Sequence, residues 1–380
     1  MRVAVMHNLP AGGARRRLES QVQAMDVDVV EICLATAEPI TERPVVVSYE
    51  PLAPPRRPAW RPPLRYADTA RLIRAWRIAG TAIARSGADV IYANPCQYLQ
   101  APAGLLFVSQ PAVYFCDEPR RIDYEPDAKA TLNPTTRAMY APLRRAERSL
   151  DRSAVGRADL ILTNSRYTAA GVLGAYGRDA EPIPLGVAPR FHPVPVEGRT
   201  GHVLSVGMLI PSKGHDLVIR AAGRCTPARR VVVVAPRPDH AGRQRLEAIA
   251  RDEGVELQIL VGISDEELRT LYSGAFATAY MARAEPLGLA SLEAQACGSP
   301  VVVADEGGLP ETIDPGVTGF AVARRADALA AALGALADDG RRAAMADAAR
   351  RRGAELRWKR SADSVLDALR QVLGTSPVTR

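Results

Sequence analysis

The chain has 380 residues, of which 47% are hydrophobic and 24% are charged, and its formal net charge is +7. This length predicts two globular domains rather than one. No apolar run reaches the roughly 18 residues that span a bilayer, the five cysteines lack the spacing of a metal site or a disulfide framework, and an aromatic content of 5% without a stacking motif argues against nucleic-acid binding.

The first half of the chain alternates apolar strand patterns with helical patterns, which predicts a parallel sheet covered by helices. The first strand pattern follows Met1 directly, with no signal-peptide core, so we expect a cytoplasmic protein. Pro10, Gly12 and Gly13 mark a turn before the first helix. The predicted strands are residues 2–7, 26–34, 88–94, 112–117 and 158–164, and the predicted helices are residues 14–25, 66–85 and 137–157.

Three segments of this half need a choice between interpretations. The helix at 66–85 carries arginines among its apolar residues, so it could lie on a membrane, but packing on the sheet with an arginine-rich outer face is favoured. Asp26-Val27-Asp28 has the form of a metal-binding acidic motif, yet no turn residues flank it and a plain alternating strand is favoured. Residues 51–64 are rich in proline and predict a surface loop.

The second half repeats the same alternation after a break in composition. Residues 181–200 are rich in proline and glycine with little periodicity, which predicts an interdomain linker. A helical pattern runs from residue 326 to the mid-350s, and residues 361–373 form a last amphipathic helix. The strand patterns between them are residues 202–207, 230–235, 257–262, 276–281 and 300–305.

The segment EPLGLASLEAQACGSPVVVADEGGLPE at residues 285–311 is the most informative part of the chain. Its helical portion begins after Gly288 and ends near Gly298, so Glu285 is expected in the preceding loop and Glu293 one turn inside the helix. The first backbone N–H groups of this helix, near Gly288 and Leu289, would favour a phosphate. Two carboxylates beside such a site would suit a sugar diphosphate, because carboxylates accept hydrogen bonds from vicinal hydroxyls.

This segment resembles the E-x7-E segment of retaining glycosyltransferase family 4, also called glycosyl transferases group 1. Three further segments resemble the family in the same order: MRVAVMHNLPAGG at 1–13, ADLILTNSRYTAAGVLGAYG at 158–177 and SVGMLIPSKGHDLVIRAA at 205–222. The resemblance implies an α/β protein of GT-B fold, in which two Rossmann-like doubly wound parallel-sheet domains face a central cleft. The implied domains are an acceptor-side domain of residues 1–190, to which a C-terminal helix within 356–380 returns, and a donor-side domain of residues 191–355.

The same resemblance implies roles for individual residues. Lys213 would neutralise the diphosphate, Glu285 would orient the donor sugar and stabilise positive charge on it, and Glu293 would hold the ribose hydroxyls. The alternative to this role is that Glu293 is an exposed helical residue or a salt-bridge partner. Gly12 and Gly13 would let the backbone approach the diphosphate or the acceptor. The expected catalytic residues are Lys213, Glu285 and Asp117, and the expected donor-binding residues are Gly207, Lys213, Glu285, Leu287, Gly288, Leu289 and Glu293.

Two positions depart from the family pattern. Met208 stands where the family usually has an arginine, which removes a bidentate phosphate donor. Either another arginine replaces it, or the enzyme is slow, or the chain does not catalyse. Asp117 stands where relatives often have a histidine near the donor sugar. It could accept a hydrogen bond or act as a base there, or it could be a loop carboxylate paired with Arg120 or Arg121.

The resemblance therefore predicts a retaining glycosyltransferase that moves a sugar from a UDP- or GDP-sugar to an acceptor hydroxyl without a metal or other cofactor. The alternatives are a catalytically silent sugar-nucleotide-binding partner subunit and a related epimerase or phosphorylase; a Rossmann dehydrogenase is disfavoured because the G-x-G-x-x-G loop is missing. The acceptor could be a glycan, a lipid-linked sugar or a small natural product. We expect a monomer or weak dimer, with peripheral contact at the inner face of the membrane as an option.

Overall fold

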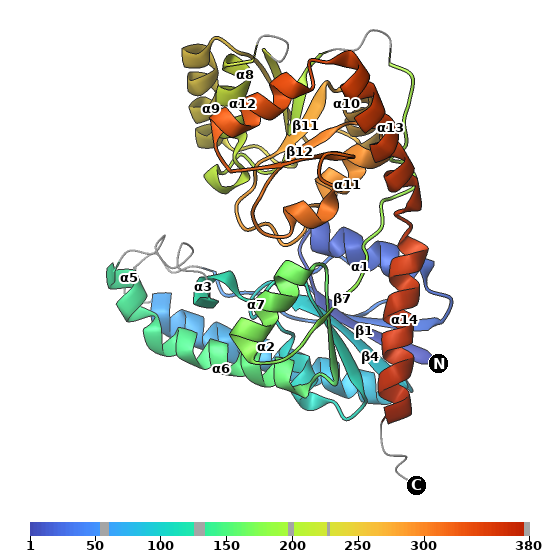
Figure 1. The fold of residues 1–380 in the computed structure, drawn as a ribbon. Coiled ribbons are helices and arrows are strands. Elements are labelled where there is room, and N and C mark those ends of the chain that lie inside the picture. Colours follow the sequence, from blue (N-terminus) through green and yellow to red (C-terminus); the bar gives the residue numbers. More distant parts are fainter. Residues whose placement is uncertain (54–60, 125–133, 197–200, 226–228, 376–380) are drawn as a thin grey trace. The chain divides into compact units, whose positions relative to one another are not determined.

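The computed structural model describes residues 1–53, 61–124, 134–196, 201–225 and 229–375 (Figure 1). The chain divides into two compact units, of which the first comprises Met1–Pro184 with Lys359–Arg380 and the second comprises Leu185–Trp358. Each unit is built on a parallel sheet. Among the described residues, no helix combines the length and the apolar character that crossing a bilayer requires.

The sheet of the first unit has the strand order β3-β2-β1-β4-β5-β6-β7. Every strand predicted in this half is present, because each has a run of buried apolar residues. The sequence did not reveal β3 or the two-residue β7, which lies at the start of the segment expected to be a linker. The strands are β1 (Arg2–Asn8), β2 (Asp28–Leu34), β3 (Val45–Val47), β4 (Val90–Cys96), β5 (Ala112–Cys116), β6 (Leu160–Thr163) and β7 (Glu181–Pro182).

The helices of the first unit cover the sheet and confirm that the arginine-rich helix packs on it. This helix, α2 (Arg61–Arg85), buries Leu72, Trp76 and Ile83 against the core, while arginines and the 51%-exposed Ile78 face outward. It begins before the predicted start, because prolines in a first turn cost no hydrogen bond. Part of the predicted proline-rich loop, residues 54–60, lies outside the described residues. The other elements are α1 (Gly13–Ala24), η2 (Ala103–Phe107), α3 (Arg121–Tyr124), α5 (Pro134–Met139), α6 (Ala141–Arg157) and α7 (Arg166–Tyr176).

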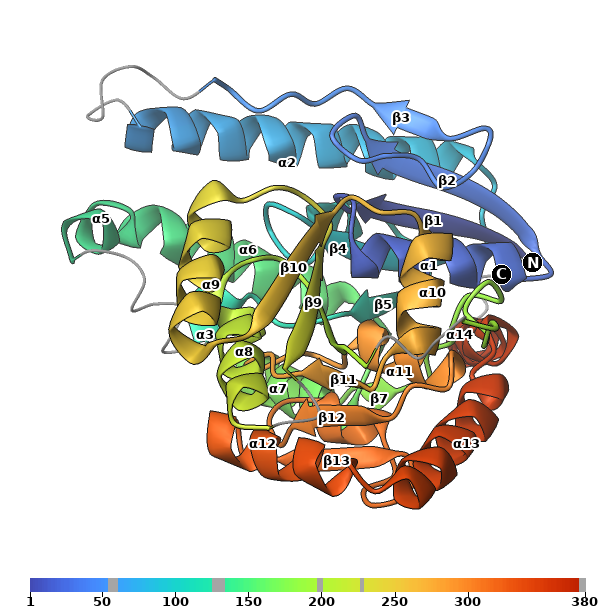
Figure 2. The same ribbon diagram turned by 90° about the horizontal axis from the view of Figure 1, so that it is seen from above.

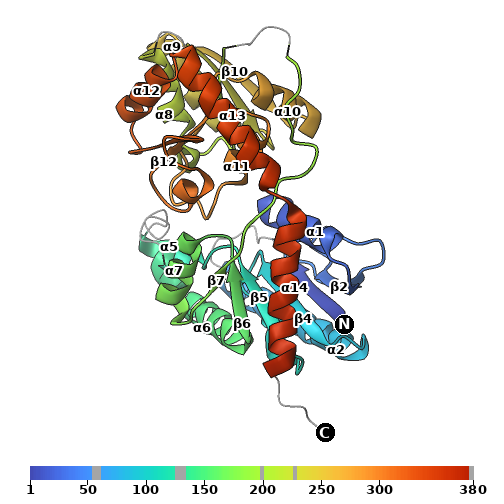
Figure 3. The same cartoon turned by 45° about the vertical axis from the view of Figure 1, so that its right-hand side comes forward.

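The last helix, α14 (Trp358–Thr375), returns to the first unit, as the resemblance implies. Figure 1 and Figure 3 show it running beside the sheet of this unit. Its apolar residues at helical spacing, including Val365 and Leu369, are fully buried. The contact also has a polar part, because the Gln21 side-chain amide of α1 donates to the Ser361 hydroxyl at 2.9 Å.

Of the acidic sequence at 26–28, only Asp28 lies in a strand, because Asp26 and Val27 precede β2. Asp28 opens β2 and accepts a 2.6 Å hydrogen bond from the Arg2 guanidinium in the neighbouring strand β1. Both side chains are exposed, at 46% for Arg2 and 56% for Asp28. This cross-strand ion pair accounts for the acidic residue Asp28, so no metal is needed to explain it.

The sheet of the second unit has the strand order β10-β9-β8-β11-β12-β13, in which the direction of the crossovers reverses between β8 and β11. In the view of Figure 2, α8, α9 and α12 lie to one side of the strands, and α10 and α13 lie to the other. The strands are β8 (Val203–Val206), β9 (Arg230–Ala235), β10 (Glu256–Val261), β11 (Ala277–Tyr280), β12 (Val301–Ala304) and β13 (Gly319–Val322), of which β13 was not predicted. The helices are η3 (Pro211–Lys213), α8 (His215–Gly223), α9 (His240–Glu253), α10 (Asp265–Gly274), α11 (Leu289–Ala296), η5 (Leu309–Thr312), α12 (Ala326–Ala335) and α13 (Asp339–Glu355).

Candidate functional site

Lys213 and Glu285 meet in the second unit, although 72 positions separate them in the chain. The Lys213 ammonium donates to Glu285 Oε2 at 2.7 Å, and the Tyr280 hydroxyl donates to Glu285 Oε1 at 3.1 Å. Lys213 follows β8 and Glu285 follows β11, and these two strands pair directly. In open α/β sheets, ligands bind beyond the carboxyl ends of strands where the strand order reverses, so this pair stands at the expected binding edge.

Close backbone packing at glycines fixes the segments that carry Lys213 and Glu285. Gly214, the N-cap of α8, has φ 72°, and a Cβ there would lie 2.2 Å from the Met281 carbonyl oxygen, so only glycine fits beside Lys213. Gly307 and Gly308 pack in the same way on the segment that carries Glu285: Gly308 N–H donates to the Glu285 carbonyl at 2.8 Å, and a Cβ on Gly307 would lie 2.6 Å from that oxygen. This double glycine was not predicted as part of the site, although its position after a buried strand was a usable signal.

A buried histidine braces the loop before Lys213. His215 Nε2 lies 3.1 Å from the Met208 carbonyl, which can only accept, so Nε2 carries the proton and Nδ1 accepts from the Ser205 hydroxyl at 2.8 Å. Burial lowers the pKa of His215 to about 4, and the hydrogen bonds do not offset this. The neutral ring therefore holds the loop between β8 and η3 in place.

Glu293 lies inside α11, one turn after Gly288, as predicted. Its side chain is buried and accepts a hydrogen bond from the Tyr272 hydroxyl at 3.3 Å, so the alternative of an exposed helical residue is wrong. Gly288 is the N-cap with φ 107°, and Leu309 would clash with a Cβ there at 2.6 Å. Among the described side chains, none caps the first turn of α11, while Leu287 and Leu289 flank Gly288 in the chain.

In the first unit, Gly12 is the N-cap of α1 and Gly13 is its first residue; both are exposed, with open space where a Cβ on Gly12 would stand. Packing therefore does not require glycine at position 12. Asp117 follows β5 and forms a bidentate ion pair with Arg17, at 2.9 Å from Nε and 2.8 Å from Nη2. Of the two alternatives for Asp117, pairing with Arg120 or Arg121 is not what the structure shows: Arg120 contacts Asp123 and Glu147, and Arg121 contacts Glu118.

Comparison with known proteins places the second unit in a family. Residues 192–352 match the family model described as glycosyl transferases group 1. D-inositol 3-phosphate glycosyltransferase from Acidothermus cellulolyticus is 32% identical over 248 residues, which cover 58% of this chain and 54% of the relative. The protein of the same name from Mycolicibacterium paratuberculosis is 38% identical over 181 residues, which cover 45% of this chain and 40% of the relative. The chain thus spans about half the length of the curated relatives it matches.

Residues 192–352 therefore belong to the glycosyl transferases group 1 family. Solved structures match the fold of nearly the whole chain. Sucrose-phosphate synthase from Thermosynechococcus elongatus superimposes with a TM-score of 0.75 at 19% identity, covering 99% of this chain and 100% of that one. HepE of Anabaena in complex with UDP gives 0.72 at 19% identity, covering 98% and 100%. WaaG, a glycosyltransferase involved in lipopolysaccharide biosynthesis, gives 0.68 at 17% identity, covering 97% and 99%. The expected GT-B fold is confirmed.

The position that departs from the group 1 pattern, Met208, is 36% exposed beside the Lys213 loop. Two arginines reach the neighbouring backbone: Arg324 Nε donates to the Met281 carbonyl at 2.9 Å, and Arg245 donates to the Leu209 carbonyl at 3.1 Å. A second guanidinium nitrogen of Arg324 lies 3.5 Å from the Pro211 carbonyl. Arg324 therefore links the turn that carries Lys213 to the residue that follows β11.

One group of described residues has the composition of a metal site but not its chemistry. His7, Glu31 and Cys33 are buried with their ligand atoms within 4.8 Å of one another. Glu31 already accepts hydrogen bonds from His7 Nε2, from the N–H groups of Ile40 and Thr41, and from the Thr41 hydroxyl. Burial and the charge of Glu31 raise the pKa of Cys33 to about 12, so its thiol stays protonated. These residues are satisfied without an ion.

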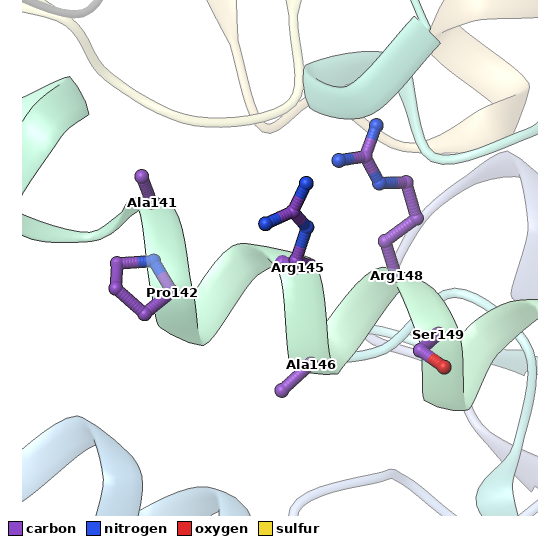
Figure 4. A pocket seen from close by; sticks show the side chains of 6 residues that line it. All are labelled: Ala141, Pro142, Arg145, Ala146, Arg148 and Ser149. Carbon is purple, nitrogen blue, oxygen red and sulfur yellow. The ribbon is translucent and has the colours of Figure 1, made fainter.

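A wide surface hollow of about 670 Å³ lies along α6, lined by residues of this helix alone. Figure 4 shows Arg145 and Arg148 projecting from the same side of the helix. None of the predicted site residues lines it, so we do not place the donor there. The lining residues are Ala141, Pro142, Arg145, Ala146, Arg148 and Ser149.

Because of its two buried histidines, His202 and His215, we expect the second unit to lose stability in acid. Burial lowers the pKa of His215 to about 4, and burial with the charge of Arg230 does the same for His202. Because the unfolded chain has the ordinary value near 6.5, the folded state binds fewer protons between these values. We expect stability to be full above about pH 6.5 and to fall by about 3 kcal/mol for each histidine as the pH drops to 4. Urea unfolding of His215→Leu, with exposed His240→Gln as control, should show a smaller acid loss only in the former.

A strained residue precedes Glu285 directly. Ala284 has φ 47°, in the left-handed region that favours glycine. Ala284→Gly should raise the free energy of unfolding by up to about 1 kcal/mol, because relief of roughly 1–2 kcal/mol exceeds the added entropy of the unfolded chain. A decrease in that free energy, measured by urea unfolding, would show that Ala284 is not strained.

Proposed function

We propose that this protein is a retaining glycosyltransferase that moves a sugar from a nucleotide diphosphate sugar to an acceptor hydroxyl. The observation that carries the proposal is the contact between Lys213 and Glu285 beyond the neighbouring strands β8 and β11. HepE of Anabaena was solved in complex with UDP, and this supports a uridine nucleotide as the leaving group of the donor. Family membership supports sugar transfer as the reaction.

The chemistry needs a cation at the leaving group and an oriented sugar. The acceptor oxygen forms a bond to the anomeric carbon while the bond from that carbon to the diphosphate oxygen breaks, and the acceptor proton passes to the leaving phosphate. Negative charge therefore grows on the diphosphate, where preorganised positive charge stabilises the transition state most. Lys213 is 18% exposed, so its ammonium can exchange the Glu285 carboxylate for phosphate oxygens, which frees Glu285 to accept from sugar hydroxyls.

The remaining predicted residues complete the donor site. In this proposal Glu293 holds the ribose hydroxyls, while Gly207, Leu287, Gly288 and Leu289 present backbone to the diphosphate sugar. Gly207 supports this role, because a Cβ there would stand 3.3 Å from the Lys213 side chain. The second unit is then the donor-side domain, and the first unit, with Gly12, Gly13 and Asp117, is the acceptor-side domain.

Incubation with a panel of sugar-nucleotide donors, called the donor panel below, tests this function. The protein is incubated with a mixture of UDP-glucose, UDP-N-acetylglucosamine and GDP-mannose, and mass spectrometry follows each donor. One donor should be retained preferentially or slowly hydrolysed. If every donor stays intact and unbound, the proposal fails. Binding without turnover, also with a panel of acceptors, would favour the second candidate, a catalytically silent partner subunit, which Met208 in place of the family's arginine motivates.

We propose that transfer needs no metal, because the Lys213 ammonium and the first N–H groups of α11 supply positive charge at the diphosphate. Donor turnover should therefore be unchanged, within about twofold, by prior treatment with EDTA. Loss of turnover that magnesium restores would contradict this.

The arginine-rich outer face of α2 supports peripheral contact with an anionic membrane surface. Arg71, Arg74 and Arg77 are exposed there beside Ile78. The protein should sediment with vesicles that contain an anionic lipid and not with neutral vesicles. Equal sedimentation with both would contradict an electrostatic contact.

A further inference from the structure

The guanidinium of Arg17 is the centre of a buried polar network in the first unit. Arg17 lies in α1, just after the Gly12–Gly13 turn, and its side chain is 1% exposed. All five of its N–H groups have acceptors, and its Cζ lies 3.7 Å from the centroid of the Phe115 ring. The acceptors are both Asp117 oxygens at 2.9 and 2.8 Å, Asn94 Oδ1 at 2.9 Å, Gln21 Oε1 at 2.7 Å and the Tyr92 hydroxyl at 3.1 Å.

These contacts join elements that are distant in sequence. Asn94 belongs to β4 and Asp117 follows β5, so Arg17 holds the carboxyl ends of two neighbouring strands to the start of α1. Gln21 extends the network to α14 through its 2.9 Å hydrogen bond to Ser361. The Asn164 side-chain amide donates to the Asp117 carbonyl at 2.9 Å and fixes the backbone of that residue as well. The network therefore determines where the Asp117 carboxylate points.

Stability alone does not account for a buried ion pair of this kind. Removing two charges from water is costly, and apolar residues of similar volume are often as stable or more so. The Asp117 side chain also keeps 15% of its surface exposed, and a carboxylate has lone pairs beyond the two that Arg17 occupies. The arrangement leaves Asp117 able to accept one more hydrogen bond in a fixed direction.

We propose that Arg17 is a positioning residue for sugar transfer, which orients Asp117 as a hydrogen-bond acceptor for a sugar hydroxyl and fixes the start of α1 behind the Gly12–Gly13 turn. This inference rests on the proposed function. Asp117 accepts without taking the proton, because a protonated Asp117 would leave the charge of Arg17 uncompensated in the interior. Lysine cannot replace Arg17, since it lacks the planar fork that contacts both carboxylate oxygens.

The first test is Arg17→Lys, measured with the donor that the parent consumes in the donor panel. We expect kcat for donor hydrolysis to fall by about 10- to 100-fold, while the KM for the donor stays within twofold, because the nucleotide and diphosphate are assigned to the second unit. Titration with the matching nucleoside diphosphate counts the folded sites, so kcat is expressed per site. Arg15→Lys on the same helix, whose partners are Glu19 and the Glu38 and Pro39 carbonyls, is the matched control and should behave as the parent.

The second test separates positioning from proton transfer. Asp117→Asn should lower kcat and leave the shape of its pH profile unchanged. An altered acidic limb in that variant would show that Asp117 takes a proton, and an unchanged kcat per site in Arg17→Lys would show a purely structural role; either result overturns the inference while the proposed function stands. A parent that turns over none of the donors would instead contradict the proposed function, and with it this inference.

Discussion

Lys213→Ala is expected to lower the rate of sugar transfer at saturating donor by about 100- to 1000-fold, the usual cost of removing one preorganised group that stabilises a developing negative charge. The variant should fold normally, because Lys213 and Glu285 are each 18% exposed and water can solvate the carboxylate that loses its partner. The change should appear in kcat as well as in KM, since the charge on the diphosphate is greatest in the transition state.

The natural control for this variant is another lysine of the same chain. Lys359 on α14 forms an exposed ion pair with Asp363, one turn along the same helix. Lys359→Ala should therefore leave the transfer rate within about twofold of the parent. A Lys213→Ala variant with the parent's rate at saturating donor would remove this residue from the mechanism.

Asp117→Ala is expected to lower the free energy of unfolding by about 3–5 kcal/mol, because it leaves the Arg17 guanidinium buried without a counter-charge. Burial by itself would lower the pKa of Arg17, but the negative charge of Asp117 and the hydrogen bonds to Asp117 and Tyr92 outweigh it, and the pKa is raised. Arg17 therefore cannot escape the cost by losing its proton. Urea unfolding monitored by circular dichroism measures the effect.

The exposed pair of Arg2 and Asp28 in the same sheet is the control for this prediction. Asp28→Ala should cost about 0–1 kcal/mol, because both side chains are solvated. The double variant Arg17→Met with Asp117→Ala should regain most of the lost stability, since it removes the unpaired charge. If Asp117→Ala costs no more than Asp28→Ala, the network around Arg17 does not hold the fold together.

The fold could largely be predicted from the sequence because its signals are local. Long strands such as β1 and β9 are continuous apolar runs, and the turn at Gly288 and the helix after it follow from residue type alone. The strands β3 and β7, with three and two residues, are too short to show a period. Length does not explain the missed β13, because it has four residues like the predicted β12. The start of α2 was missed because proline disfavours most of a helix but not its first turn.

The candidate site could be predicted only in part, because its contacts are not local. The spacing of Glu285 and Glu293, with the family resemblance around Lys213, indicated a diphosphate site, but not that Lys213 and Glu285 would pair with each other. No pattern within a short window relates Arg17 to Asp117, which lie 100 positions apart, so the ion-pair partners considered for Asp117 were the nearby Arg120 and Arg121. Tyr280 and His215 act through hydrogen bonds whose partners are known only from the fold.

Calorimetric titration of the parent and of Lys213→Ala with UDP, GDP and the corresponding nucleosides tests the central claim most directly. If Lys213 holds the diphosphate, the parent should bind one nucleoside diphosphate at least about tenfold more tightly than the variant does, and the two proteins should bind the nucleoside equally. Equal affinity of parent and variant for that diphosphate would contradict the account.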